Sequence, residues 1–235
     1  VCIYSSWKQF KKMRSIIIIL FLGVFSKSFA QVAIIDDKDG YTNVRSEPNA
    51  KSVILYKIKT NQVFWFGQED YFSENVKWIQ IEIPKNSYSL ECGSLYNLVG
   101  YIHKSKIKPL NTINEYIGTD ISFEYETKTF SEENKIIDYS NNWITAINGL
   151  HPWGTDGEKP KMEVEELNIK INGSKVYVPE ILISDIYECD NNFSIYKVGQ
   201  TFFVHQWNGD AAGAYEIVWV LTTNGITQRL VGTLR

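Results

Sequence analysis

Hydrophobic and polar residues alternate along much of the chain, a pattern that is typical of β-strands with one buried face. Residues 121–130 show it most clearly, because Ile121, Phe123 and Tyr125 fall on one face of an extended chain and charged residues fall on the other. Similar apolar segments recur roughly every 8 to 12 residues, with turn residues between them. The pattern predicts an all-β protein without a long helix.

We expect strands over residues 41–45, 53–58, 62–66, 78–81, 100–107, 121–130, 135–139, 143–147, 164–171, 176–178, 194–198, 201–207, 215–221 and 227–231. In the first of these, Thr42 and Val44 share one face, and we expect Val44 to point inward. Asn-Gly pairs at 172–173 and 224–225 stand between apolar segments and predict hairpins. Residues 150–162 are expected to form a loop.

Residues 42–49 (TNVRSEPN) resemble the N-V-R-S-G-P-S signature of bacterial SH3 (SH3b) domains. The segments 53–58, 62–66, 78–81 and 100–107 follow in the order of that family. The resemblance covers roughly residues 32–110 and implies a small, strongly bent β-barrel that binds peptidoglycan or peptide, or docks beside a catalytic domain. Two features depart from the family: Glu47 replaces the usual glycine, and residues 84–98 form an insertion.

The chain is therefore divided into a leader and signal peptide (1–30), an SH3b-like barrel (31–110), a linker (111–118) and a β-rich domain of unknown type (119–235). The last part resembles no family, and its evenly spaced strands favour a β-sandwich or an open barrel. The predicted fold class is all-β, with a small SH3-like barrel followed by a β-sandwich or open-barrel domain.

The first 30 residues have the build of a secretory signal peptide. A basic flank precedes the apolar residues 16–25, and Ser28 and Ala30 place small residues at the −3 and −1 positions of a cleavage site. The alternative is a transmembrane anchor, which needs about 20 apolar residues. We expect cleavage, a periplasmic or secreted protein, and no membrane association afterwards.

The net charge of the mature chain bears on which classes of partner it can bind. Residues 1–30 contain five basic residues and no acidic one, so the mature chain has 19 basic and 27 acidic residues and a net charge of −8. An acidic protein binds phosphate backbones poorly, which argues against nucleic acid as a partner.

Two cysteines remain in the mature chain, Cys92 and Cys189. An even number in an oxidising compartment allows a disulfide between them. The alternative is two buried thiols that behave as small hydrophobic side chains.

The barrel offers five candidate binding residues, which could form a shallow aromatic groove: Tyr41, Asn43, Arg45, Trp65 and Tyr101. Aromatic faces bind sugar rings and peptide side chains, and an arginine can hold a carboxylate through two hydrogen bonds. The alternative is that most of these aromatic rings fill the core of a very small barrel.

In the second half, residues 151–157 form the loop most typical of a binding site, with His151, Trp153 and Asp156. Residues 208–214, which include Asp210, form a loop of small residues. Polar and aromatic side chains on anchored loops are common in binding sites. The alternative is ordinary loop structure, with Trp153 packed on the sheet edge.

No catalytic motif of the G-x-S-x-G or H-E-x-x-H type is present, and the three histidines are far apart in sequence. We expect no catalytic residue, no metal and no cofactor. The predicted function is an exported, non-catalytic binding or adaptor protein of the cell envelope, with peptidoglycan, a peptide or a protein as partner. Two alternatives stay open: a cell-wall hydrolase or peptidase whose catalytic part lies in the second half, and an inhibitor or immunity-type protein.

Overall fold

The computed structural model describes residues 32–90, 97–209 and 212–233. Within these ranges the chain is all-β, with several antiparallel sheets and one α-helix of five residues, α1 (Gln68–Phe72). The predicted fold class, all-β with a β-sandwich or open-barrel architecture, is confirmed. The resemblance of the first part to an SH3b domain stays a prediction. No helix in these ranges has the length and apolar character needed to cross a bilayer.

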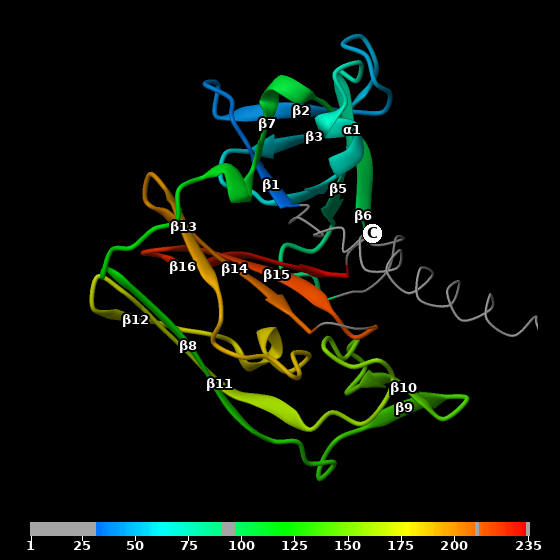
Figure 1. The fold of residues 1–235 in the computed structure, drawn as a ribbon, viewed down its shortest axis with the longest axis vertical. Helices are drawn as coiled ribbons and strands as arrows, with labels where there is room; N and C mark the ends of the chain where they lie inside the picture. The colour runs from blue at the N-terminus through cyan, green and yellow to red at the C-terminus, as the bar shows by residue number, and fades with distance from the viewer. Residues whose placement is uncertain (1–31, 91–96, 210–211, 234–235) are drawn as a thin grey trace, which may run out of the picture.

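The first part of the chain forms one sheet of seven strands. Its strands are β1 (Val32–Ile35), β2 (Tyr41–Arg45), β3 (Ile54–Lys59), β4 (Phe64–Phe66), β5 (Trp78–Pro84), β6 (Asn97–His103) and β7 (Ile107–Pro109). They lie in the order β3-β2-β6-β5-β4-β1-β7, and the sheet curves around its own core at the top of Figure 1. Val44 points into this core as predicted, beside Ile58 and Phe64. The end strands β3 and β7 do not pair among the described residues, so the sheet is not a closed barrel.

The second part contains two further sheets, packed face to face. One has the order β12-β11-β8, from β8 (Ile121–Thr129), β11 (Met162–Ile171) and β12 (Ser174–Val176). The other has the order β13-β14-β15-β16, from β13 (Ser194–Val198), β14 (Thr201–Asn208), β15 (Tyr215–Thr222) and β16 (Gly225–Gly232). Tyr125 accepts a hydrogen bond of 2.7 Å from the Trp219 indole between them. The alternating face predicted at Ile121, Phe123 and Tyr125 is buried here.

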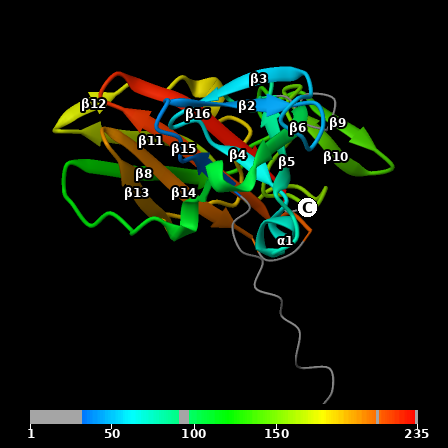
Figure 2. The ribbon, with the colours of Figure 1, turned by 90° about the horizontal axis from the view of Figure 1, so that it is seen from above.

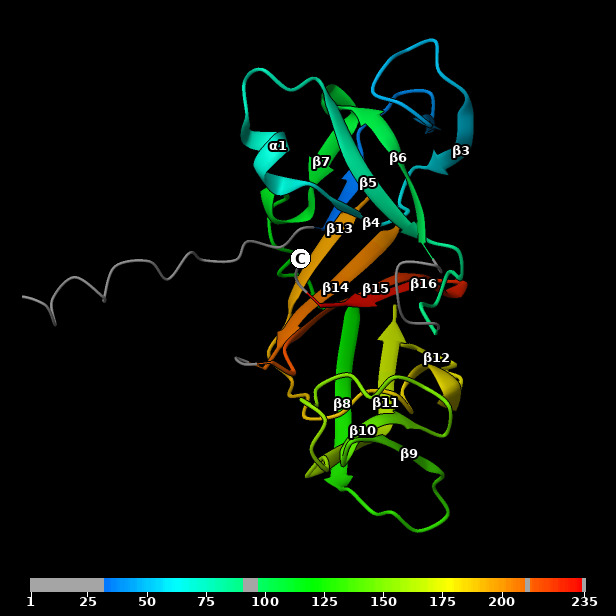
Figure 3. The same cartoon turned by 90° about the vertical axis from the view of Figure 1, so that its right-hand side faces the viewer.

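The four-stranded sheet is the middle of three layers, with the seven-stranded sheet on one side and β8 and β11 on the other (Figures 1 and 3). Its face toward the first part of the chain forms an apolar cluster in which Val32 and Ile34 meet Phe203 and Val218. The Gln228 side chain also bonds the backbone nitrogen and oxygen of Val63, at 2.9 and 2.8 Å. Burial on both faces explains why β15 is apolar at nearly every position.

A buried arginine of the second part of the chain, held in an ion pair, also bonds the first part. Arg229 in β16 is fully buried and binds Asp185 through two hydrogen bonds of 2.6 Å. Its Nε also donates to the carbonyl of Tyr88 at 2.8 Å, and its backbone nitrogen donates to Ser87 at 2.9 Å. The described part of the predicted insertion is therefore fixed to the second half of the chain.

A small hairpin of β9 (Ile137–Ser140) and β10 (Trp143–Ile147) lies at the lower end of the molecule in Figure 1. Three details differ from the predicted strands. The sequence did not indicate β1, whose four residues are all buried and therefore do not alternate. It did not indicate α1, and the segment predicted at 100–107 is broken into β6 and β7 by a 3₁₀ turn over Lys104–Lys106.

Candidate functional site

The two loops singled out in the second half lie together. A cavity of about 350 Å³ opens between the loop that follows β10 and the loop that joins β14 to β15. We call it the loop cleft. It is lined by Gly154, Thr155, Asp156, Glu158, Lys159, Pro160, Lys161, Glu188, Gly209, Gly213 and Ala214. Segments far apart in sequence therefore share one cavity at the end of the sandwich.

Glycine allows the two loops to approach backbone to backbone. A Cβ at Gly213 would lie 2.8 Å from the carbonyl carbon of Thr155 and 3.1 Å from the amide nitrogen of Asp156. Gly154 has a φ of +99°, and a Cβ there would lie 2.1 Å from the carbonyl oxygen of Tyr187. No other residue fits either position without moving the chain. The shape of the loop cleft is thus set by main-chain packing.

Glu188 fixes the third wall of the cleft. Its carboxylate accepts hydrogen bonds from the backbone nitrogens of Lys161 and Met162, the latter at 3.0 Å. Trp153 donates from its backbone to Asp185 and accepts from Tyr187, both at 2.8 Å. These contacts hold the cleft loop against the segment before β13, so its polar side chains project from an anchored backbone.

The rim of the cleft carries charges of both signs. Asp156 and Glu158 are exposed, and Asp156 accepts a hydrogen bond of 3.3 Å from the Glu158 backbone. Lys159 is paired with Glu132 at 2.7 Å. Within the described ranges, the Glu158 and Lys161 side chains have neither a hydrogen-bond nor an ion-pair partner. The cleft thus presents carboxylates and an ammonium group to a ligand.

An aromatic side chain adjoins the cleft loop. Trp143 in β10 is 52% exposed, and its indole covers Gly157 so closely that a Cβ there would lie 2.6 Å from Cε3. An indole at this position offers apolar contact beside a polar cavity.

Two of the other residues predicted in this half take different positions. Trp153 is 6% exposed and packs in the sandwich core with its ring 6.4 Å from that of Tyr215. His151 lies edge-on against Trp153 at 4.4 Å, and its partial burial lowers its pKa, an effect that the Asp185 carboxylate opposes. Only Asp156 of the three lines the cleft, and Asp210 lies outside the described residues.

The structure brings together four of the five candidates in the first part of the chain. Tyr41, Asn43 and Arg45 share the outer face of β2, and Arg45 lies opposite Tyr101 in β6. The Arg45 guanidinium donates to the Ser52 carbonyl at 2.7 Å, which fixes it over the turn that follows.

Trp65 lies apart from this group. It is half-buried at the contact between the two halves, where a Cβ at Gly232 would lie 3.0 Å from its ring. Its side chain therefore packs against β16 rather than beside Tyr41. A ligand role for any of the five stays a prediction.

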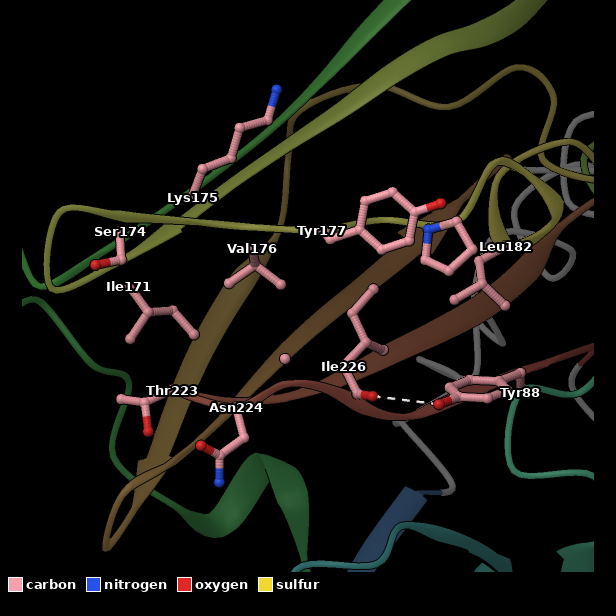
Figure 4. Close-up of a pocket in the computed structure, with 12 residues that line it drawn as sticks. Tyr88, Ile171, Ser174, Lys175, Val176, Tyr177, Leu182, Thr223, Asn224 and Ile226 are labelled. Atoms are coloured by element: carbon pink, nitrogen blue, oxygen red, sulfur yellow. Dashed lines mark hydrogen bonds between the residues drawn. The ribbon is translucent and has the colours of Figure 1, made fainter.

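A second cavity, of about 320 Å³, lies between β12 and the β15–β16 turn (Figure 4). Val176, Leu182 and Ile226 give it apolar walls, and Tyr88 donates its hydroxyl hydrogen to the Ile226 carbonyl at 3.3 Å. Sequence reasoning missed this cavity, because its walls come from three stretches far apart in sequence and none of them carries a binding motif.

Cys189 lies beside the sandwich core, and its burial raises the pKa of its thiol to about 12. Cys92 lies outside the described residues, so the disulfide stays a prediction. His205 binds the fully buried Glu216 at 2.7 Å. Across residues 32–90, 97–209 and 212–233, no group of three or more His, Cys, Asp or Glu residues is placed to hold a metal ion.

Comparison with known proteins adds no relative. No protein-family model matches this chain, and no curated protein and no solved structure matches it.

Proposed function

We propose that this chain is an exported, non-catalytic binding protein of the cell envelope, and that the loop cleft holds its ligand. The observation that carries the proposal is the convergence of the two loops on one cavity shaped by Gly154 and Gly213. Loops held on a rigid β-scaffold are the usual place for binding residues. A cavity of about 350 Å³ is within the range of small-ligand sites.

The charges of the cleft favour a ligand that carries both amino and carboxylate groups. Lys161 suits a carboxylate, and Asp156 and Glu158 suit an ammonium group. The stem peptide of peptidoglycan carries groups of both kinds and is present where a signal peptide would deliver the protein. Trp143 adds an apolar surface next to the cavity for the remainder of such a ligand.

The face formed by Tyr41, Arg45 and Tyr101 is a second place where the same ligand could bind, because the first part of the chain resembles an SH3b domain. An Arg45→Ala variant separates the two sites. If the loop cleft is the ligand site, this variant keeps the affinity of the wild-type chain.

Isothermal titration of the mature chain with a soluble peptidoglycan fragment that carries a tripeptide stem tests the proposal. Lys161→Glu removes the ammonium group from the cleft and should weaken binding about tenfold or more, as expected for a lost charged hydrogen bond. Lys170→Glu is the matched control, because Lys170 is an exposed lysine of β11, the strand that follows Lys161, and lies outside the cleft. It should bind as the wild type does.

Two results would contradict the proposal. One is the absence of saturable binding, or an equal loss in both lysine variants. The other is shortening of the fragment during the titration, seen by mass spectrometry, which would identify the chain as a hydrolase instead.

A further inference from the structure

Strand β3 is the free end of the seven-stranded sheet, with β2 as its neighbour on one side (Figure 2). Large apolar side chains are exposed along it and just before it: Val53 68%, Ile54 46%, Leu55 43% and Tyr56 37%. Natural sheet edges are usually short, bulged, charged, covered or interrupted by proline, and β3 combines a bulge and two lysines with exposed apolar side chains. An edge with this many exposed apolar side chains is typical of an interaction surface.

The ladder with β2 shows which backbone groups of β3 are free. Thr60 donates to the Gly40 carbonyl at 2.9 Å, and the register then pairs Thr42 with Ile58. Because hydrogen-bonded pairs alternate along an antiparallel ladder, the backbone groups of Lys57 and Lys59 point away from β2.

The position of Gln62 agrees with this alternation. The outward nitrogen of Lys59 donates to the Gln62 side chain at 2.7 Å, which caps that end of the edge. The outward backbone groups of Lys57 have no partner among the described residues. The β-bulge between Val44 and Arg45 leaves Leu55 without a partner in β2. A short added strand would find unpaired donors and acceptors here.

The same edge is basic in an acidic protein. Lys51, Lys57 and Lys59 are exposed, and residues 50–60 contain no acidic side chain. The Lys57 ammonium group lies 4.6 Å from the centre of the Tyr41 ring, which holds it on the outer face of the sheet. The charge of the edge is therefore complementary to acidic side chains.

The opposite edge of the sheet lacks these features. Strand β7 has only three residues, ends at Pro109 and runs directly into a 3₁₀ turn over Leu110–Thr112. Proline has no backbone donor, and an edge this short offers few free groups. Of the two edges, β3 is the longer one and has unpaired backbone groups at Lys57 among the described residues.

We propose that the β3 edge binds an extended segment of a partner protein in which acidic and apolar residues alternate, so that the segment adds a strand to the sheet. Its backbone would pair with Lys57, its apolar side chains would cover Ile54 and Leu55, and its carboxylates would reach Lys57 and Lys59. A second copy of this chain is a poorer occupant, because pairing two β3 strands brings two sets of lysines together. The inference is independent of the loop cleft, which lies in the other half of the chain.

Fluorescence anisotropy of the mature chain with a dye-labelled peptide of alternating Glu and Val residues tests this inference. Saturable binding is expected, and Lys57→Glu combined with Lys59→Glu should weaken it about tenfold or more. Lys170→Glu should leave it unchanged. N-methylation of alternate peptide amides should weaken binding to a similar degree, because it removes the donors of the added strand.

Circular dichroism of the double variant should match that of the wild-type chain, because both side chains are exposed. The inference is overturned by the absence of saturable binding or by equal affinity for the N-methylated peptide. It is also overturned if sedimentation shows a dimer that the double variant abolishes, since the occupant would then be a second copy.

Discussion

Removal of the Asp185 carboxylate is expected to destabilise the whole molecule. Arg229 is fully buried and Asp185 is 2% exposed, so Asp185→Ala leaves a guanidinium without its counter-ion in the interior. Breaking a buried pair in this way typically costs about 3–5 kcal/mol of unfolding free energy. The carbonyls of Tyr88 and Leu182 still accept from Arg229, but they carry no compensating charge. We therefore expect a loss within that range.

Urea denaturation followed by tryptophan fluorescence measures the change. Glu166→Ala is the control, because the Glu166–Lys175 pair has nearly the same length, 2.8 Å, but lies at the surface. Exposed pairs contribute little, so this control should lose several times less stability.

The double variant Asp185→Leu, Arg229→Met removes the charge together with its partner. It should regain part of the unfolding free energy that Asp185→Ala loses, because apolar replacement of a buried ion pair is often neutral or stabilising in other proteins. The reasoning is refuted if Asp185→Ala unfolds at the same urea concentration as Glu166→Ala, or if the double variant is less stable than Asp185→Ala.

Three other predictions concern the cleft, the pH response and export. Gly154→Ala should lower the unfolding free energy by at least about 2 kcal/mol, because the new Cβ meets both a left-handed backbone and a clash with Tyr187. Gly149 has a φ of +77° and open space around it, so Gly149→Ala should lower the unfolding free energy by about 1 kcal/mol in the same denaturation assay. Burial lowers the folded-state pKa of His151, so the unfolded chain binds more protons. The unfolding free energy should therefore fall as pH drops from about 7 to 5, through the ordinary histidine pKa of about 6.5, and His151→Phe should flatten this dependence. N-terminal sequencing of protein recovered from a bacterial periplasm should begin at Gln31; retention of the first 30 residues would contradict the predicted cleavage.

The alternation of apolar and polar residues predicted strands correctly where a strand buries one face. It located β2 and β8 and gave the inward side of both, at Val44 and at Phe123. It failed at β1, where both faces are buried and no polar residue marks a face. The Asn-Gly pair at 172–173 marked the β11–β12 hairpin because both residues adopt the left-handed backbone of that turn.

The candidate site was only partly predictable. Sequence composition marked the loops at Asp156 and at 208–214, but their convergence depends on sheet packing, which local sequence does not contain. The same composition pointed to Trp153 as a ligand contact, although its indole packs in the sandwich core. The Arg229–Asp185 pair gave no signal, because its members lie 44 residues apart and neither lies in a motif.

A peptidoglycan stem peptide is proposed to bind between the two converging loops. Backbone amide NMR of the mature chain, recorded while a soluble stem-peptide fragment is added, tests it directly. Binding in the loop cleft should give saturable shifts at Thr155, Asp156, Lys161 and Gly213. Shifts confined to the β2 face, at Asn43 and Arg45, or no shifts at all, would contradict it.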